Sequence, residues 1–230
     1  MISRDINVDR VRSIRLFKHM SESHLHSMLR SASVRQVRPR SLLFKEGSRP
    51  NVLYTLLAGS VELFSEYRDK HCTLAIVRSV RPCVLASIWQ DRHRLSARTL
   101  VASELLLIPA SNLHKLIEID RGFAGDATAQ LAEECDDTLE KLKNGNLRSS
   151  TERLAQWLLR FDQEAGGAGQ FMIPCDKRTL ASYLGMAPEH LSRNLAALAP
   201  SGLVVRGRRV ALNNRYALEI AAGLKLPSGG

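Results

Sequence analysis

Residues 178–198, RTLASYLGMAPEHLSRNLAAL, constrain the fold of this chain more than any other stretch of its sequence. Their apolar spacing predicts two short helices joined at Gly185, because glycine readily adopts the positive φ of such a turn. Ala181, four residues earlier, is small enough for the two helices to cross closely. This spacing matches a DNA-binding helix-turn-helix, whose second helix enters the major groove. A plain helical hairpin remains the alternative for the motif taken alone.

A cationic β-hairpin is predicted directly after this motif. Residues 203–205 and 210–212 are two short apolar runs, and a turn separates them. The residues of this turn are Arg206, Gly207, Arg208 and Arg209. A helix-turn-helix followed by a hairpin is a winged helix, whose basic tip would contact phosphates beside the groove. A basic turn that is merely solvated is the alternative.

Length and composition are those of an ordinary soluble protein. The 230 residues, 44% hydrophobic and 24% charged, allow one large domain or two smaller ones. No apolar run approaches the roughly 20 residues that span a bilayer, and the N-terminus lacks a secretory signal. We therefore expect a cytoplasmic protein without membrane association. The four cysteines form no CxxC pair, which argues against a zinc site and a disulfide framework.

The formal net charge of +10 indicates a polyanionic partner, and we expect double-stranded DNA. Lys and Arg outnumber Asp and Glu within residues 1–60 and 150–230, while residues 61–149 are nearly neutral. The C-terminal excess agrees with the winged helix. The N-terminal excess has three open interpretations: contact with flanking DNA, contact with an acidic protein surface, or no contact at all.

Residues 34–110 consist of short β-rich runs separated by turn residues. Such runs predict an antiparallel β-sandwich or barrel, and a helical lead-in over 14–30 precedes it. A short amphipathic helix over 111–119 follows. The predicted strands fall within 34–37, 41–44, 52–64, 72–77, 81–87, 97–103 and 104–110.

Residues 121–147 predict one long helix with a narrow apolar stripe between charged positions. The stripe consists of Ala124, Thr128, Leu131, Cys135, Thr138 and Leu142. A stripe of this width suits a seam between two parallel helices and therefore a homodimer. Packing of the stripe against its own domain is the alternative, and both can hold on opposite sides of the helix.

The predicted fold class is α+β, with a domain boundary near 146–151. We expect an antiparallel β-sandwich with its helical lead-in over 1–120, the long helix over 121–147, and a winged helix-turn-helix over 148–225. Within the last domain, a helix is expected over 152–164 and a strand over 170–174.

This order of domains resembles the CRP/FNR family of bacterial transcription regulators. Residues 41–64, SLLFKEGSRPNVLYTLLAGSVELF, are similar to the core of the family's sandwich, and 178–195 are similar to its DNA-reading unit. The resemblance implies an effector domain with a jelly roll of the cyclic-nucleotide-binding type. It also implies a homodimer on an inverted repeat, which mostly activates transcription by touching RNA polymerase.

The second helix of the motif carries an E-x-x-S-R pattern similar to that of the FNR-like branch. Pro188 suits its first turn, and Glu189, Ser192 and Arg193 share one face. The resemblance implies that the arginine reads guanine, the glutamate cytosine and the serine a thymine, with His190 exposed nearby. The expected site is TTGAT-N4-ATCAA.

Other residues of the same region are candidates for phosphate contacts. They are Lys177, Arg178, Thr179, Arg206, Arg208 and Arg209. Asn194 departs from the family, which usually has an aliphatic residue there. It either loosens the packing of its helix or adds a polar contact.

The effector site departs further from the cyclic-nucleotide members of the family. Those members hold the ribose with a glycine–glutamate pair and the phosphate with an arginine–serine pair. Here Ala86–Ser87 stand in the first place, and Leu95 stands where the arginine precedes Ser96. Arg94 and Arg98 are near, but adjacent residues of a strand face opposite sides. We therefore predict DNA binding that is independent of cyclic AMP.

A haem- or redox-sensing member of the same family is one alternative. Iron–sulfur sensing is disfavoured because no cysteine precedes Cys72. Haem has candidate ligands in His71–Cys72, and Cys175 is a candidate redox switch unless it is a small buried hydrophobe. The further histidines are His19, His24, His26, His93 and His114.

A cyclic-nucleotide-binding regulatory module of an enzyme is the other alternative. The chain has no segment left over for catalysis, and it shows no nucleophile–base constellation, P-loop or metal-ligand spacing. We therefore expect neither enzymatic activity nor a metal site, and no required cofactor.

Overall fold

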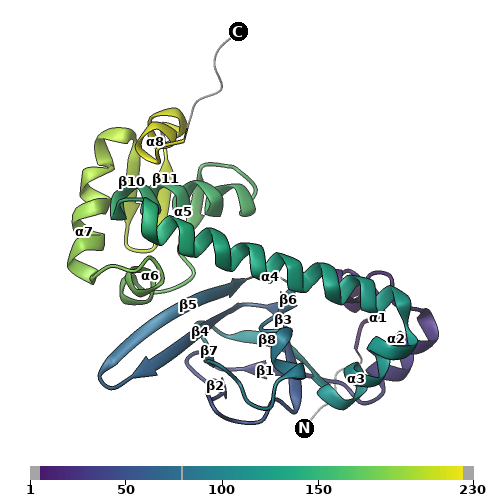
Figure 1. Cartoon of the computed structure of the whole chain (residues 1–230). Coiled ribbons are helices and arrows are strands. Elements are labelled where there is room, and N and C mark those ends of the chain that lie inside the picture. Colours follow the sequence, from purple (N-terminus) through teal and green to yellow (C-terminus); the bar gives the residue numbers. More distant parts are fainter. Residues whose placement is uncertain (1–5, 79, 225–230) are drawn as a thin grey trace. The chain divides into compact units, whose positions relative to one another are not determined.

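Two four-stranded antiparallel sheets face each other in the N-terminal part of the computed structural model, which describes residues 6–78 and 80–224 (Figure 1). One sheet has the order β1 (Ser33–Val37), β8 (Ser103–Pro109), β3 (Val52–Ala58) and β6 (Arg81–Pro82). The other has the order β2 (Leu42–Phe44), β7 (Ser96–Thr99), β4 (Ser60–Tyr67) and β5 (Lys70–Arg78). The predicted antiparallel sandwich is confirmed.

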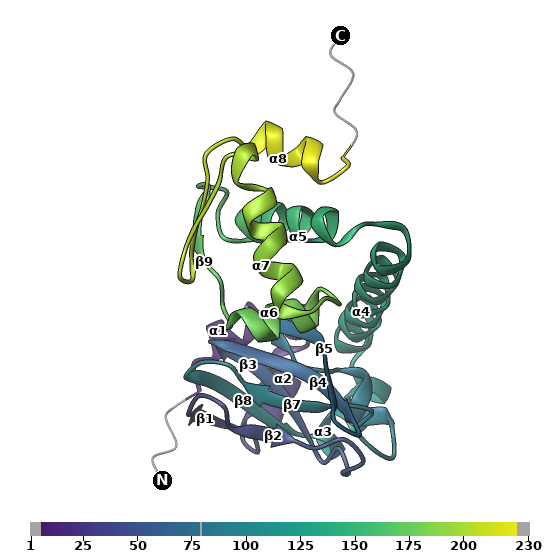
Figure 2. The same ribbon diagram turned by 90° about the vertical axis from the view of Figure 1, so that its left-hand side faces the viewer.

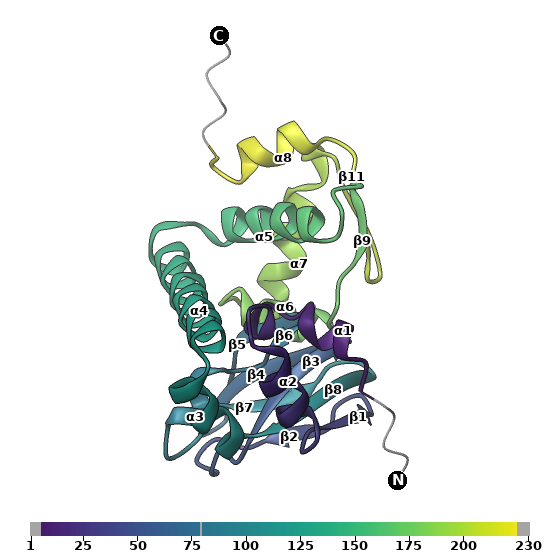
Figure 3. The same ribbon diagram turned by 90° about the vertical axis from the view of Figure 1, so that its right-hand side faces the viewer.

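The first of these sheets is buried on both faces. Leu56 and Leu105 contribute to the core between the two sheets, whereas Leu53 and Leu106 contribute to a second core. Figure 3 shows the helices α1 (Val8–Arg12) and α2 (Glu22–Leu29) over the second face. Alternate residues of one strand thus serve two cores, as the period of a strand requires.

The predicted strand over 52–64 is two strands that meet at Gly59. The φ of Gly59 is +104°, and a Cβ on it would lie 2.3 Å from Ser103 Oγ. Only glycine fits this sharp connection between the sheets. The predicted helical lead-in is also divided, into α1, a 3-10 turn over Arg15–Phe17, and α2.

Two further strand predictions are wrong in extent. The run 81–87 is a strand only over Arg81–Pro82, because proline has no N–H to extend the ladder, and a 3-10 helix η2 (Ala86–Trp89) follows. The run 97–103 ends as a strand at Thr99, whose hydroxyl donates to Arg38 O at 2.6 Å.

Helix α3 (Ala110–Ile119) leads into the long helix α4 (Arg121–Leu147), as predicted. Between them, Asp120 accepts hydrogen bonds from the backbone N–H groups of Phe123 and Ser21, each at 2.9 Å, and lies 2.7 Å from His24 Nδ1. Burial opposes the ionisation of Asp120, but these hydrogen bonds outweigh it and hold its pKa below the usual range. Asp126 similarly accepts from His19 N at 2.7 Å. The N-terminal helices are thereby fastened to the start of α4.

The C-terminal part contains the predicted winged helix-turn-helix (Figure 2). Ser149 caps its first helix in a capping box with Glu152, and Leu154, Leu158 and Leu180 are fully buried. The three-stranded sheet has the order β10-β11-β9. The elements are α5 (Ser150–Glu164), β9 (Gln170–Met172), α6 (Lys177–Tyr183), α7 (Pro188–Ala197), β10 (Leu203–Arg206), β11 (Arg209–Leu212) and α8 (Arg215–Ala221).

The chain divides into two units, Met1–Thr138 and Leu139–Gly230. Helix α4 contributes residues to both, because it continues without a break through Asn144–Gly145–Asn146. The boundary predicted near 146–151 instead coincides with the turn from α4 to α5. Lys225, the last residue of the predicted third domain, lies outside the described residues.

Candidate nucleic-acid interface

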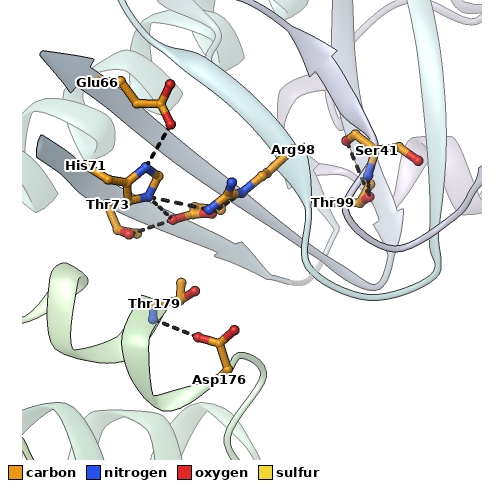
Figure 4. Close-up of polar contacts among 9 residues, drawn as sticks. Ser41, Glu66, His71, Thr73, Arg98, Thr99, Asp176 and Thr179 are labelled. Atoms are coloured by element: carbon orange, nitrogen blue, oxygen red, sulfur yellow. Dashed lines mark hydrogen bonds and ion pairs between the residues drawn. The ribbon is translucent and has the colours of Figure 1, made fainter. Parts of the chain in front are cut away.

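The helix-turn-helix is held by one capping carboxylate and one glycine. Asp176 Oδ1 accepts from Thr179 N at 2.8 Å and so caps α6 (Figure 4). Ala181 is fully buried, and its carbonyl accepts from Met186 N at 3.0 Å across the turn. Gly185 has a φ of +65°. The turn therefore forms as the sequence predicts.

Helix α7 presents one buried and one exposed face. Leu191 and Leu195 are buried, whereas Glu189, Ser192 and Arg193 are exposed. The Ser192 hydroxyl donates to Pro188 O at 3.2 Å, which leaves its lone pairs free. In the part of the chain that the structure describes, the Glu189 carboxylate and the Arg193 guanidinium form no hydrogen bond or ion pair. The face holds a donor fork and an acceptor ready for base edges.

Pro188 and His190 are also exposed, at the first turn of α7. Lys177 and Arg178 are exposed at the first turn of α6, but Thr179 beside them is buried. Its backbone N–H is already taken by Asp176. Of these three phosphate candidates, the two cations are the accessible ones.

The wing is a tight hairpin between β10 and β11. Arg206 and Arg209 pair at its end, and Gly207 adopts a φ of +62° in the two-residue turn. Arg208 is anchored, because its Nε donates to Ile173 O at 2.8 Å. All three arginines are exposed, so the tip of the wing is a concentrated positive charge.

The apolar stripe of α4 is largely open to solvent in the single chain. Leu142 is 61% exposed, and Thr128, Cys135 and Thr138 are exposed as well. Both threonine hydroxyls donate to the carbonyl one helical turn earlier, at 2.8 and 2.7 Å, so the side chains present methyl groups. Ala124 is half-buried, and Leu131 packs against the N-terminal core.

The strand that resembles a phosphate-binding cassette carries its cation on the outer face. Arg98 Nε lies 2.6 Å from Glu62 Oε2, and Glu62 is fully buried. Thr73 and His71 also contact this carboxylate, at 2.6 and 2.9 Å (Figure 4). Arg98 stacks over Phe64, 4.7 Å from the ring centre. Ala97, on the opposite side of the strand, is part of the core between the sheets.

The interior side of the same region is apolar. Leu95 packs against the core between the sheets, and Ser96 Oγ accepts from Glu46 N at 3.0 Å. Ser87 lies in η2 and donates to Val84 O at 2.9 Å. Arg94 is exposed. The side chains expected to replace the nucleotide contacts are thus occupied by the fold itself.

The cysteines and histidines serve packing and internal pairing. Cys175 is 3% exposed, and Cys83 is buried, which raises the pKa of its thiol to about 12. His93 stacks on Phe44 with ring centres 4.0 Å apart, and burial lowers its pKa. No group of three or more potential metal-ligating side chains occurs among residues 6–78 and 80–224.

One residue of this region was missed from the sequence. Arg153 of α5 donates through Nε to Leu184 O at 3.1 Å and through a terminal nitrogen to Arg148 O at 2.7 Å. It therefore joins the end of α6 to the chain between α4 and α5. An arginine three residues into an amphipathic helix gives no sequence signal for such a role.

Comparisons with known proteins agree with this geometry. Residues 34–120 match the cyclic nucleotide-binding domain family, and residues 152–220 match the Crp-like helix-turn-helix domain family. The chain is 21% identical over 201 residues to the transcriptional activator protein FnrA of Stutzerimonas stutzeri, a match that covers 82% of this chain and 80% of that protein.

Solved structures share the fold over nearly the whole chain. FixK2 from Bradyrhizobium japonicum is 25% identical with a TM-score of 0.77, covering 86% of this chain and 99% of that one. A CooA mutant from Carboxydothermus hydrogenoformans is 16% identical with a TM-score of 0.74, covering 96% and 98%.

The chain belongs to the CRP/FNR family. It is a transcription regulator whose C-terminal unit is a helix-turn-helix DNA-binding domain. The family is one of regulators rather than enzymes. Among the described residues, every helix is too short or too polar to cross a membrane.

Proposed function

We propose that this regulator binds as a homodimer to an inverted repeat, TTGAT-N4-ATCAA, and does so without a cyclic nucleotide. The observation that carries the proposal is the exposed face of α7. Glu189, Ser192 and Arg193 start from one side of a helix whose other side is buried by Leu191 and Leu195. Those three side chains therefore project together into one groove.

Each side chain on this face matches a base edge. The Arg193 fork can donate twice to guanine O6 and N7, and the Glu189 carboxylate can accept from cytosine N4. Ser192 is short and keeps free lone pairs, which suits a contact at thymine. Lys177, Arg178 and the wing arginines would contact phosphates and fix the register without reading sequence.

The exposed stripe of α4 supports the homodimer. A single helix in water gains nothing from a row of leucine and threonine methyl groups, whereas a second copy of the helix would cover it. A parallel pair places two copies of α7 about a two-fold axis. That symmetry requires an inverted repeat with half-sites about one helical turn apart. Activation would then proceed by contact with RNA polymerase.

The occupied cassette supports independence from cyclic nucleotides. A cyclic phosphate buried in the sandwich needs a cation, because an unpaired buried charge is strongly unfavourable. Leu95 cannot supply one, and Arg98 is committed to Glu62 on the outer face. The residues present therefore do not fit a cyclic nucleotide.

A haem- or redox-dependent regulator has weaker support. Both ring nitrogens of His71 lie near carboxylates, Glu62 at 2.9 Å and Glu66 at 3.3 Å. Cys175 is buried, which suits a small hydrophobe better than a reactive thiol. We propose no cofactor, and an absorption spectrum of the purified protein tests this directly, since bound haem would give a Soret band.

Fluorescence anisotropy tests the proposed function. Purified protein is titrated against the TTGAT-N4-ATCAA duplex and against a duplex in which the guanine of each half-site is replaced. The proposal expects tight binding to the first, without added nucleotide, and weak binding to the second. Equal affinities for the two duplexes would refute it.

A further inference from the structure

Asn194 forms the polar contact that seats the reading helix on its domain. Its Nδ2 donates to Ser150 Oγ at 2.9 Å and approaches Met186 Sδ at 3.6 Å. Its Oδ1 accepts from Thr151 Oγ1 at 3.2 Å. Asn194 lies half-buried beside the apolar face of α7, next in sequence to Arg193. The departure from an aliphatic residue at this position thus adds polar contacts.

The partners of this amide come from two different segments. Ser150 and Thr151 are the first residues of α5, while Met186 is in the turn between α6 and α7. The capping of α5 is done by Ser149 with Glu152, so the hydroxyls of the next two residues are not needed for it. They are left to hold Asn194.

Apolar packing alone does not fix the rotation of α7 about its axis. The contacts of Leu191 and Leu195 are non-directional, whereas hydrogen bonds are lost when their angles change. The Arg193 guanidinium stands at the end of a long side chain, so a small rotation of the helix displaces it considerably. A bidentate contact to guanine requires planar alignment of both donors.

We infer that Asn194 is a positioning residue for base reading, which fixes the rotation of α7 and thereby the strength with which Arg193 discriminates guanine. This inference rests on the proposed function of Arg193. It differs from a purely structural role, because it predicts a change in discrimination rather than in overall DNA affinity.

The test compares Asn194→Leu with wild type on three duplexes. These are TTGAT-N4-ATCAA, the same duplex with both half-site guanines replaced, and an unrelated sequence. We expect the discrimination ratio between the first two to fall about tenfold, which corresponds to about 1.4 kcal/mol. Affinity for the unrelated sequence and the salt dependence should stay within about twofold of wild type. Asn146→Leu, at an exposed asparagine near the end of α4, is the matched control and should change nothing.

The partner side provides an independent check. Thr151→Val and Ser150→Ala should each lower the same ratio, and neither should add its full effect to Asn194→Leu, since the residues share one network. Melting curves confirm that each variant is folded. Undiminished discrimination in Asn194→Leu, or an equal loss on all three duplexes, would overturn the inference. If wild type itself ignores the guanine, the proposed function fails and takes the inference with it.

Discussion

Arg98 is bound to Glu62 on the outer face of the second sheet, with Nε and Oε2 2.6 Å apart. The carboxylate is fully buried and the arginine is 35% exposed at its side chain. Removal of the arginine would leave a buried charge with only Thr73 and His71 as partners. This cation therefore has a structural task that competes with any role in effector binding.

Arg98→Ala should destabilise the N-terminal unit by about 2 kcal/mol, less than the loss for a fully buried pair, because Arg98 is partly exposed and two other groups still contact Glu62. Urea unfolding followed by circular dichroism measures this. The double variant Glu62→Gln with Arg98→Gln removes both charges and should lose less than the single variant. A larger loss in the double variant would contradict the ion-pair explanation.

Calorimetric titration with cyclic AMP and cyclic GMP should show no saturable binding at micromolar concentration. The expectation follows from Leu95 in the core and from the commitment of Arg98. Saturable binding together with tighter DNA binding would mean that another cation, such as the exposed Arg94, reaches the phosphate.

Arg193→Ala should cost about 1–3 kcal/mol per half-site and relax the preference for guanine at the third position. Arg208→Ala should weaken binding to all sequences alike and lower the salt slope by about one. Because Arg208 also bonds to Ile173 O, Arg206→Ala is the control that leaves this anchor intact. Identical behaviour of the Arg193 and wing variants would refute the distinction between base and phosphate contacts.

Leu142→Asp should convert the dimer to monomers with weak specific binding, because it places charges within the apolar seam. Leu131→Asp should do the same but also disturb the N-terminal core, so Leu142 is the cleaner site. Leu139→Asp is the matched control, since Leu139 is 56% exposed and lies one residue off the stripe. Light scattering that shows an unchanged dimer in Leu142→Asp would exclude α4 as the interface.

Asp120→Asn should lower the free energy of unfolding by about 2 kcal/mol near neutral pH, because hydrogen bonds to an ionised carboxylate are lost. The folded-state pKa of Asp120 is depressed, so its stabilisation is present above the unfolded-state pKa and is lost as pH falls through the folded-state value. The gap between variant and wild type should therefore narrow in acid. Asp91→Asn, at an exposed aspartate, should show no such gap at any pH.

Local patterns predicted most of the DNA-binding unit. Gly185, Pro188 and the buried Leu191 act as their sequence positions indicate, and α4 spans the predicted residues. Thr179 could have been recognised as buried, because Asp176 three residues earlier is a typical N-cap whose partner is the Thr179 backbone.

Contacts between distant segments were beyond the sequence. The pair of Glu62 and Arg98 depends on the register of β4 against β7, which no local pattern encodes. The same holds for Asn194, whose partners lie in α5 and in the turn before α7. Such residues are polar, and their burial follows only from the assembled fold.

Unbiased selection of bound DNA sequences by the purified protein tests the central claim most directly. The account predicts an enriched inverted repeat similar to TTGAT-N4-ATCAA, with guanine at the third position of each half-site, in the absence of any nucleotide. Arg193→Ala should lose the preference for that guanine in the same selection while it retains the symmetry. Enrichment of a non-palindromic sequence, or of a repeat without this guanine, would contradict the account.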